Sequence, residues 1–140
     1  VSKHAGASGL KFAAYAPFYP VCWSYVAFMR GKIKAPVPPD MFTKWSGSPI
    51  RIFAGGLDDY DDRDPKACED FVAEVPPEYR PLFSVKLYPS ATHGWDQPGG
   101  ELQEAIACKG RGCINRNVPD PNVTKQSIAD LVEFFSTTVR

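Results

Sequence analysis

The chain has 140 residues, about the length of one domain, and its 16 basic and 16 acidic side chains leave no formal net charge. Without a basic excess, binding to nucleic acid is not expected, and no apolar stretch approaches the roughly 20 residues that a membrane span needs. Hydrophobic residues make up 44% of the chain and charged residues 23%, which is typical of a folded globular domain.

Two strands are expected in the first part of the chain. Residues 11–20 are almost continuously apolar, the pattern of a parallel strand that is buried on both faces. Residues 31–49 are rich in proline and are expected to form an irregular loop. Residues 49–56 form a second short apolar run, which ends at a pair of glycines.

Two helices and a third strand are expected in the rest of the chain. Asp64 is expected to cap an amphipathic helix over residues 65–75, and residues 83–89 alternate as a strand does. Residues 96–123 are rich in glycine, proline and asparagine and are expected to be irregular. A last helix is expected after Thr124 as its cap. Its apolar face contains Ile128, Leu131, Val132, Phe135 and Val139.

This order of elements predicts an α/β fold with three parallel strands and flanking helices. Three strands and two helices are few for an independent α/β domain, and the first strand would have an open edge. We therefore expect the chain to be part of a larger fold.

An aspartate and a histidine follow two neighbouring strands. Asp58 comes directly after the strand at residues 49–56, and His93 lies in the loop after the strand at residues 83–89. The carboxyl ends of parallel strands gather catalytic groups, so we expect the two side chains to meet at about 2.6–3.2 Å. The carboxylate would then orient an imidazole that acts as a general base. Taken singly, Asp58 could be a turn residue and His93 a packing or surface residue.

The residues around this pair resemble the dienelactone hydrolase family of α/β-hydrolases. The similar runs are FYPVC at residues 18–22, IRIFAGGLDDY at residues 50–60 and LYPSATHGWD at residues 87–96. The resemblance implies that Asp58 is the acid and His93 the base of a catalytic triad, and that no cofactor is needed. It also implies that residues 1–140 are a partial α/β-hydrolase domain, strands six to eight and the C-terminal helix, whose partner is the N-terminal half of the same fold.

The sequence contains no nucleophile elbow of the pattern Gly-x-Ser-x-Gly. In the nearest run, around Ser8, the second glycine is one place too early, so Ser8 is expected to be a loop residue. The nucleophile is expected upstream of Val1. On this hypothesis the protein cleaves an ester or lactone bond in a small molecule by acyl transfer. The alternative is a non-catalytic α/β module, a pseudo-hydrolase, that binds a small ligand or a partner.

Three aromatic residues flank the proposed site in the sequence, and at least one of them is expected to touch the substrate. They are Trp23, Tyr60 and Trp95. Trp95 is the best candidate because it follows His93 by two residues. The alternative for all three is packing at the ends of strands.

No metal is expected. Residues 58–64 are acidic but match no frame of a calcium loop, and most of this run is expected to be a solvated turn. Cys108 and Cys113 lack a second pair at metal-binding spacing, so a small disulfide loop or two free thiols are expected there. Cys22 and Cys68 are either a disulfide or two buried thiols. The even cysteine count, together with the resemblance to exported members of the family, predicts a secreted or periplasmic protein.

Overall fold

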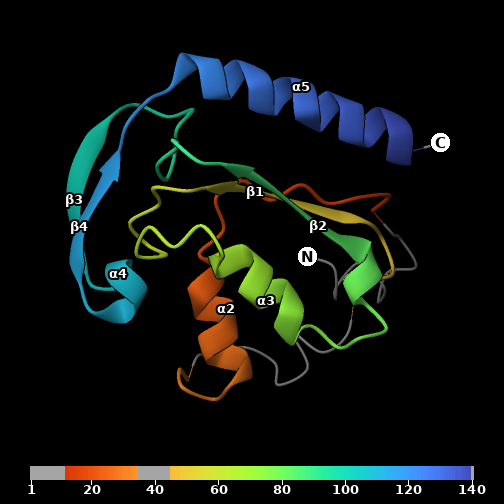
Figure 1. Ribbon diagram of the computed structural model, residues 1–140, viewed down its shortest axis with the longest axis horizontal. Helices are drawn as coiled ribbons and strands as arrows, with labels where there is room; N and C mark the ends of the chain where they lie inside the picture. Colours follow the sequence, from red (N-terminus) through yellow and green to blue (C-terminus); the bar gives the residue numbers. More distant parts are fainter. Residues whose placement is uncertain (1–11, 35–44, 140) are drawn as a thin grey trace.

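A computed structural model describes residues 12–34 and 45–139, and its centre is a pair of parallel strands (Figure 1). Strand β1 (Ile50–Gly55) pairs in parallel with strand β2 (Phe83–Tyr88) along the whole length of both. The strands expected at residues 49–56 and 83–89 are therefore confirmed.

The predicted sheet of three parallel strands is wrong. Residues 12–20 make only two isolated parallel bridges to β1, from Tyr15 and from Phe18. The backbone N–H of Tyr15 donates to the carbonyl of Pro49, just before β1, and that of Tyr19 donates to Phe53 in β1, whereas Pro17, between them, has no N–H to donate. In the described part of the chain the sheets are one parallel pair and one antiparallel pair, accompanied by four α-helices. This is not the architecture of a typical α/β-hydrolase half.

Helices cover both faces of the β1–β2 pair (Figure 1). Helices α2 (Cys22–Met29) and α3 (Ala67–Glu74) lie on one face, and α5 (Pro121–Thr138) runs along the other. The side chains of successive β1 residues point to opposite faces of the strand pair, as the pleat of a strand requires. Ile52 and Ala54 pack in a cluster with α2 and α3, while Phe53 packs with Trp95 and with Val123 of α5.

The helix expected at residues 65–75 is confirmed, but it begins at Ala67 and its N-cap is Lys66, not Asp64. The Asp64 carboxylate accepts the backbone N–H of Lys66 just before the first turn, and a 3-10 helix, η2 (Arg80–Leu82), leads into β2. Helix α2 was not predicted, because an apolar segment of eight residues shows no amphipathic period.

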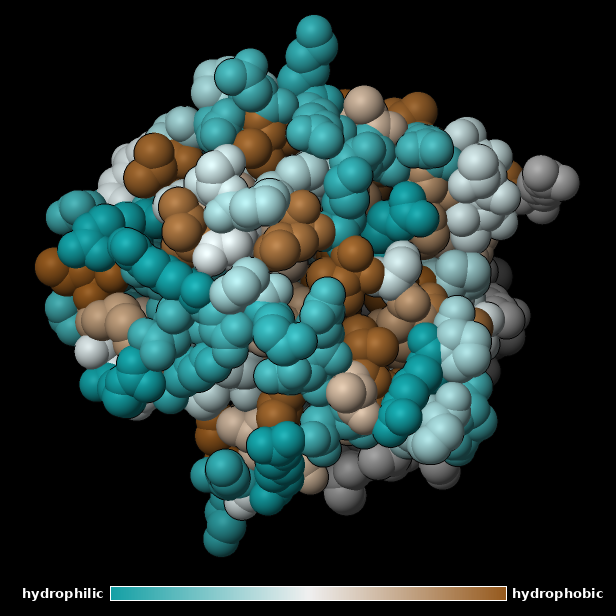
Figure 2. All heavy atoms as spheres, in the orientation of Figure 1, coloured by the Kyte–Doolittle hydropathy of each residue, from teal (hydrophilic) through white to brown (hydrophobic). Residues whose placement is uncertain are grey.

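Helix α5 is confirmed, but its cap and its buried face differ from the prediction. Asp120, not Thr124, is the N-cap. Its carboxylate accepts the backbone N–H groups of Asn122 and Val123. The helix packs through Val123, Ser127 and Phe134, which are buried. Much of the predicted apolar face is exposed, namely Ile128, Val132 and Val139. On the face in Figure 2, apolar side chains lie in several groups between polar ones.

The region expected to be irregular at residues 96–123 contains a hairpin. Strand β3 (Gly100–Glu104) pairs antiparallel with β4 (Cys113–Asn117), and the short helix α4 (Ala107–Gly110) lies between them. The prediction missed these strands because the side chains of β3 are largely exposed and show no apolar alternation. The loop expected at residues 31–49 has no helix or strand in its described parts, and residues 35–44 lie outside them.

Both cysteine pairs are disulfides. Cys22–Cys68 joins α2 to α3, and Cys108–Cys113 joins α4 to β4. No helix in the described ranges is both long enough and apolar enough to cross a bilayer.

Candidate active site

The loops that follow β1 and β2 bring Asp58 and His93 into contact. Nδ1 of His93 lies 2.9 Å from Oδ2 of Asp58, which confirms the predicted separation. Asp58 is only 2% exposed, whereas 20% of the His93 side chain is exposed. A buried carboxylate at Nδ1 leaves Nε2 of the partly exposed ring to exchange a proton with a bound group. The arrangement can therefore support general acid–base chemistry.

Two glycines allow the loops to approach each other this closely. A Cβ on Gly55 would lie 2.6 Å from the carbonyl oxygen of Ala91, and one on Gly56 would lie 2.5 Å from that of Pro89. Any larger residue would push apart the loop that carries the carboxylate and the loop that carries the imidazole. The glycine pair that ends β1 is therefore part of what positions the site.

The carboxylates of Asp58 and Asp59 have different partners. Oδ1 of Asp58 accepts the backbone N–H of Tyr60 at 2.9 Å, so both of its oxygens are held. Asp59 forms an ion pair with Arg63 at 2.8 Å and accepts the backbone N–H of Arg116 at 3.0 Å. Asp59 thus fastens β4 to this loop, while Asp58 serves the imidazole.

Two tyrosine rings lie against the His93 ring. The ring centroids of Tyr19 and Tyr60 lie 4.7 Å and 4.5 Å from that of the imidazole. Burial raises the pKa of both phenols, with the carboxylates of Glu104 and Asp58 adding to the effect at Tyr60. Both rings therefore carry a protonated hydroxyl at neutral pH.

The other two aromatic candidates lie elsewhere. Trp95 is 0% exposed, and its indole N–H donates to the hydroxyl of Ser127 on α5, so it packs beneath the site. Trp23, in the first turn of α2, lines a separate cavity of about 550 Å³ between α2, α3 and α4. Of the three residues, the structure brings Tyr60 alone to the imidazole.

A cavity of about 290 Å³ opens beside His93. Tyr19, Tyr60 and Gln97 are among the residues that line it, and the β3–β4 hairpin supplies much of the rest. Sequence reasoning missed this wall because it assigned the hairpin to an irregular segment. The polar side chains that the hairpin contributes are Glu101, Glu104, Asn115 and Asn117.

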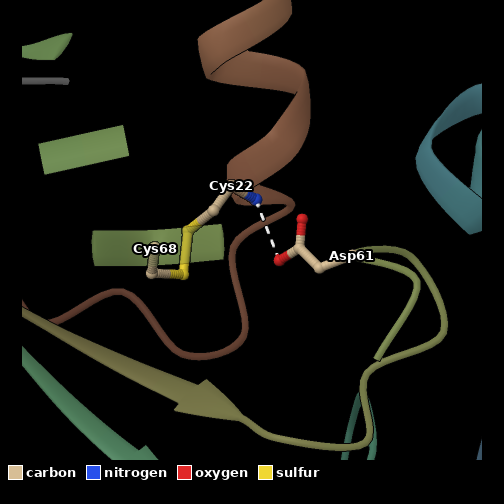
Figure 3. Close-up of side chains that lie close together, drawn as sticks. All are labelled: Cys22, Asp61 and Cys68. Atoms are coloured by element: carbon tan, nitrogen blue, oxygen red, sulfur yellow. Dashed lines mark hydrogen bonds between the residues drawn. A yellow bond between two sulfur atoms is a disulfide. The ribbon is translucent and has the colours of Figure 1, made fainter. Parts of the chain in front are cut away.

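A second cluster joins Cys22, Asp61 and Cys68, whose potential ligand atoms all lie within 4.8 Å of one another (Figure 3). The two sulfurs are bonded to each other in the disulfide, so neither is the thiolate that a metal ion would bind. The Asp61 carboxylate accepts the N–H groups of Cys22 at 3.2 Å and Trp23 at 2.7 Å. In this oxidised state the cluster is a structural link at the start of α2.

The described residues place no hydroxyl or thiol in a hydrogen bond with the His93 ring, and Ser8 lies outside them. Comparison with family models, curated proteins and solved structures finds no match for this chain. The geometry around His93 therefore carries the functional assignment.

Proposed function

We propose that the protein is an ester or lactone hydrolase of the dienelactone hydrolase type, with His93 as its general base and Asp58 as the residue that orients it. The 2.9 Å contact between the buried Asp58 carboxylate and Nδ1 of His93 carries this proposal. A carboxylate at this position holds the ring proton on Nδ1, which leaves Nε2 unprotonated and able to act as a base.

The proposed reaction proceeds by acyl transfer in two halves. Nε2 of His93 takes the proton of a hydroxyl or thiol nucleophile as that group adds to the ester carbonyl carbon. Asp58 stabilises the resulting imidazolium. The carbon–oxygen bond to the alcohol then breaks, and Nε2 gives its proton to the departing oxygen. Water repeats the sequence on the acyl group and restores the nucleophile, which is proposed to come from a segment outside the described residues.

The two disulfides support a secreted or periplasmic location. Disulfides form and persist in oxidising compartments, whereas the cytosol keeps most thiols reduced. Both cysteine pairs are oxidised here, and one of them joins two core helices.

A non-catalytic module that binds a small molecule is the alternative. It is favoured by the described hydrogen bonds of the His93 ring, which include none to a nucleophile. The hydrolase remains the better account because a cavity that only binds its ligand has no need of a buried carboxylate fixed on the imidazole.

The test compares single variants of the protein expressed from its complete coding sequence, with 4-nitrophenyl acetate and a small lactone as substrates. We expect Asp58→Asn to lower kcat by about 10⁴, because an asparagine amide donates to Nδ1 and moves the ring proton onto Nε2. His93→Ala is expected to lose at least as much.

Asp62→Asn is the matched control, since Asp62 lies in the same acidic loop but pairs with Arg111 at the surface. It is expected to keep full activity. Circular dichroism checks that every variant is folded. Hydrolysis by the wild-type protein that survives both Asp58→Asn and His93→Ala would contradict the assigned roles. A folded wild-type protein that cleaves neither substrate would favour the binding module.

A further inference from the structure

We propose that the cavity beside His93 binds the alcohol portion of the ester, and that this portion is a neutral group with several hydroxyls, such as one sugar or polyol unit. The inference rests on the proposed hydrolase activity, because that activity makes the bound group a leaving group. The volume of the cavity, about 290 Å³, lies just below the roughly 300–1,000 Å³ of pockets for drug-sized ligands, which suits a small group.

An asparagine pair on β4 gives the cavity wall an unmet hydrogen-bonding capacity. Nδ2 of Asn115 donates to Oδ1 of Asn117 at 2.9 Å, which uses one donor and one acceptor of the pair. Oδ1 of Asn115 is buried and has no partner, and within the described residues Nδ2 of Asn117 has none either. Turning both amides over again leaves one amide oxygen and one amide nitrogen without a partner. A hydroxyl group is neutral and is both donor and acceptor, so it can accept from Nδ2 of Asn117.

Tyr19 lines the cavity, and its hydroxyl is already hydrogen-bonded within the protein. That hydroxyl donates to Asp96 at 3.0 Å and accepts from Gln97 at 2.8 Å, so Tyr19 offers the cavity its ring. The backbone of Tyr19 has φ 38°, a conformation that bulky residues rarely adopt. A hydrogen bond from its N–H to the carbonyl oxygen of Phe53 holds this conformation. Strained residues of this kind cluster at ligand sites. Such a ring packs well against the C–H groups of a sugar.

The charges around the cavity favour a neutral ligand. Glu101 and Glu104 line it, and no described lysine or arginine does, so an anionic group would lie beside like charges. The Glu101 carboxylate is already paired with Arg116 at 3.3 Å, so a cationic ligand would gain little electrostatic attraction from it. Carboxylate oxygens do accept hydroxyl donors well. Hydroxyl groups therefore fit this lining better than either charge.

The experiment uses three acetate esters that differ only in their alcohol, with acetate release as the readout: 6-O-acetylglucose, acetylcholine and O-acetyl-lactate. We expect the highest kcat/KM for the neutral sugar ester. Asn117→Ala is expected to raise the KM for the sugar ester about tenfold, because one or two hydrogen bonds to its hydroxyl groups are lost. Asn122→Ala, on the exposed first turn of α5, is the control and is expected to leave KM unchanged.

Binding of methyl glucoside, which has no ester bond, is measured in parallel by saturation-transfer NMR on the wild-type protein and on both variants. Binding that Asn117→Ala weakens and Asn122→Ala does not would support the cavity, even if no ester were cleaved and the proposed hydrolase activity failed. Efficient hydrolysis of acetylcholine or O-acetyl-lactate in preference to the sugar ester, with no glucoside binding, would overturn the cavity assignment and leave the hydrolase standing.

Discussion

The carboxyl group of Asp61 makes the stability of this fold depend on pH. Asp61 is 4% exposed and accepts two backbone N–H groups at the start of α2. Burial raises its pKa from 3.8 to about 6; the N–H groups of Trp23 and Cys22 oppose this rise, and the nearby charge of Asp58 adds to it. Because this is an acid whose pKa is raised by folding, the folded protein holds the proton more tightly than the unfolded chain does.

The direction and size of the effect follow from this difference. Below about pH 4 the carboxyl is protonated in both states and costs the fold little. Between about pH 4 and about pH 6 the unfolded chain ionises while the folded protein keeps its proton, so the free energy of unfolding falls as the pH rises. Above about pH 6 the loss is complete, and a pKa difference of about two corresponds to about 3 kcal/mol.

Urea unfolding, followed by tryptophan fluorescence from pH 4 to pH 8, tests this for the wild-type protein and for Asp61→Asn. Asparagine keeps an oxygen for the helix N–H groups but does not ionise. We expect the variant to gain roughly 2–3 kcal/mol on the wild-type protein between about pH 4 and about pH 7. Contributions from groups that do not interact with Asp61 are shared by both proteins and cancel. A difference that stays constant with pH, or that changes in the opposite direction, would refute the reasoning.

Two further predictions concern the disulfides and the glycine pair. The Cys22–Cys68 bond joins residues 46 apart and Cys108–Cys113 joins residues 5 apart, so replacing each pair by alanine is expected to cost about 4 and about 2 kcal/mol in urea unfolding. Equal losses would contradict the loop-entropy explanation. Gly56→Ala would place a Cβ 2.5 Å from a backbone carbonyl and is expected to lower stability by about 1–3 kcal/mol and reduce ester hydrolysis. An unchanged Tm and rate would show that the two loops do not need this contact.

The meeting of Asp58 and His93 could be predicted because it depends on local patterns. The apolar runs of β1 and β2 mark both strands, and each of the two side chains lies within a few residues of a strand's end. Parallel pairing then fixes both loops at one edge of the sheet. Strand order and loop length predict that the two loops meet, and the resemblance identified Asp58 as the acid and His93 as the base.

The parts that failed depend on contacts between distant segments. A single proline, Pro17, interrupts the ladder of a segment that its apolar pattern assigns to a strand. On α5, helical periodicity identifies apolar residues but does not say which side meets the sheet. The buried side includes Ser127, 0% exposed, because its hydroxyl accepts the indole N–H of Trp95.

The acidic run at residues 58–64 shows most clearly that contacts between distant segments could not be predicted. It is expected to be largely a solvated turn, yet Asp58, Asp59 and Asp61 are only 2–4% exposed. Each buried carboxylate holds a different element, which a composition rule cannot distinguish: Asp58 the imidazole, Asp59 the backbone of β4, and Asp61 the first turn of α2. One turn after β1 thus links the proposed base, the cavity wall and a core helix. Since burying an unpaired carboxylate is costly, each partner is required by the aspartate it binds. The position of the hairpin wall relative to His93 is therefore set by the same turn that sets the orientation of His93.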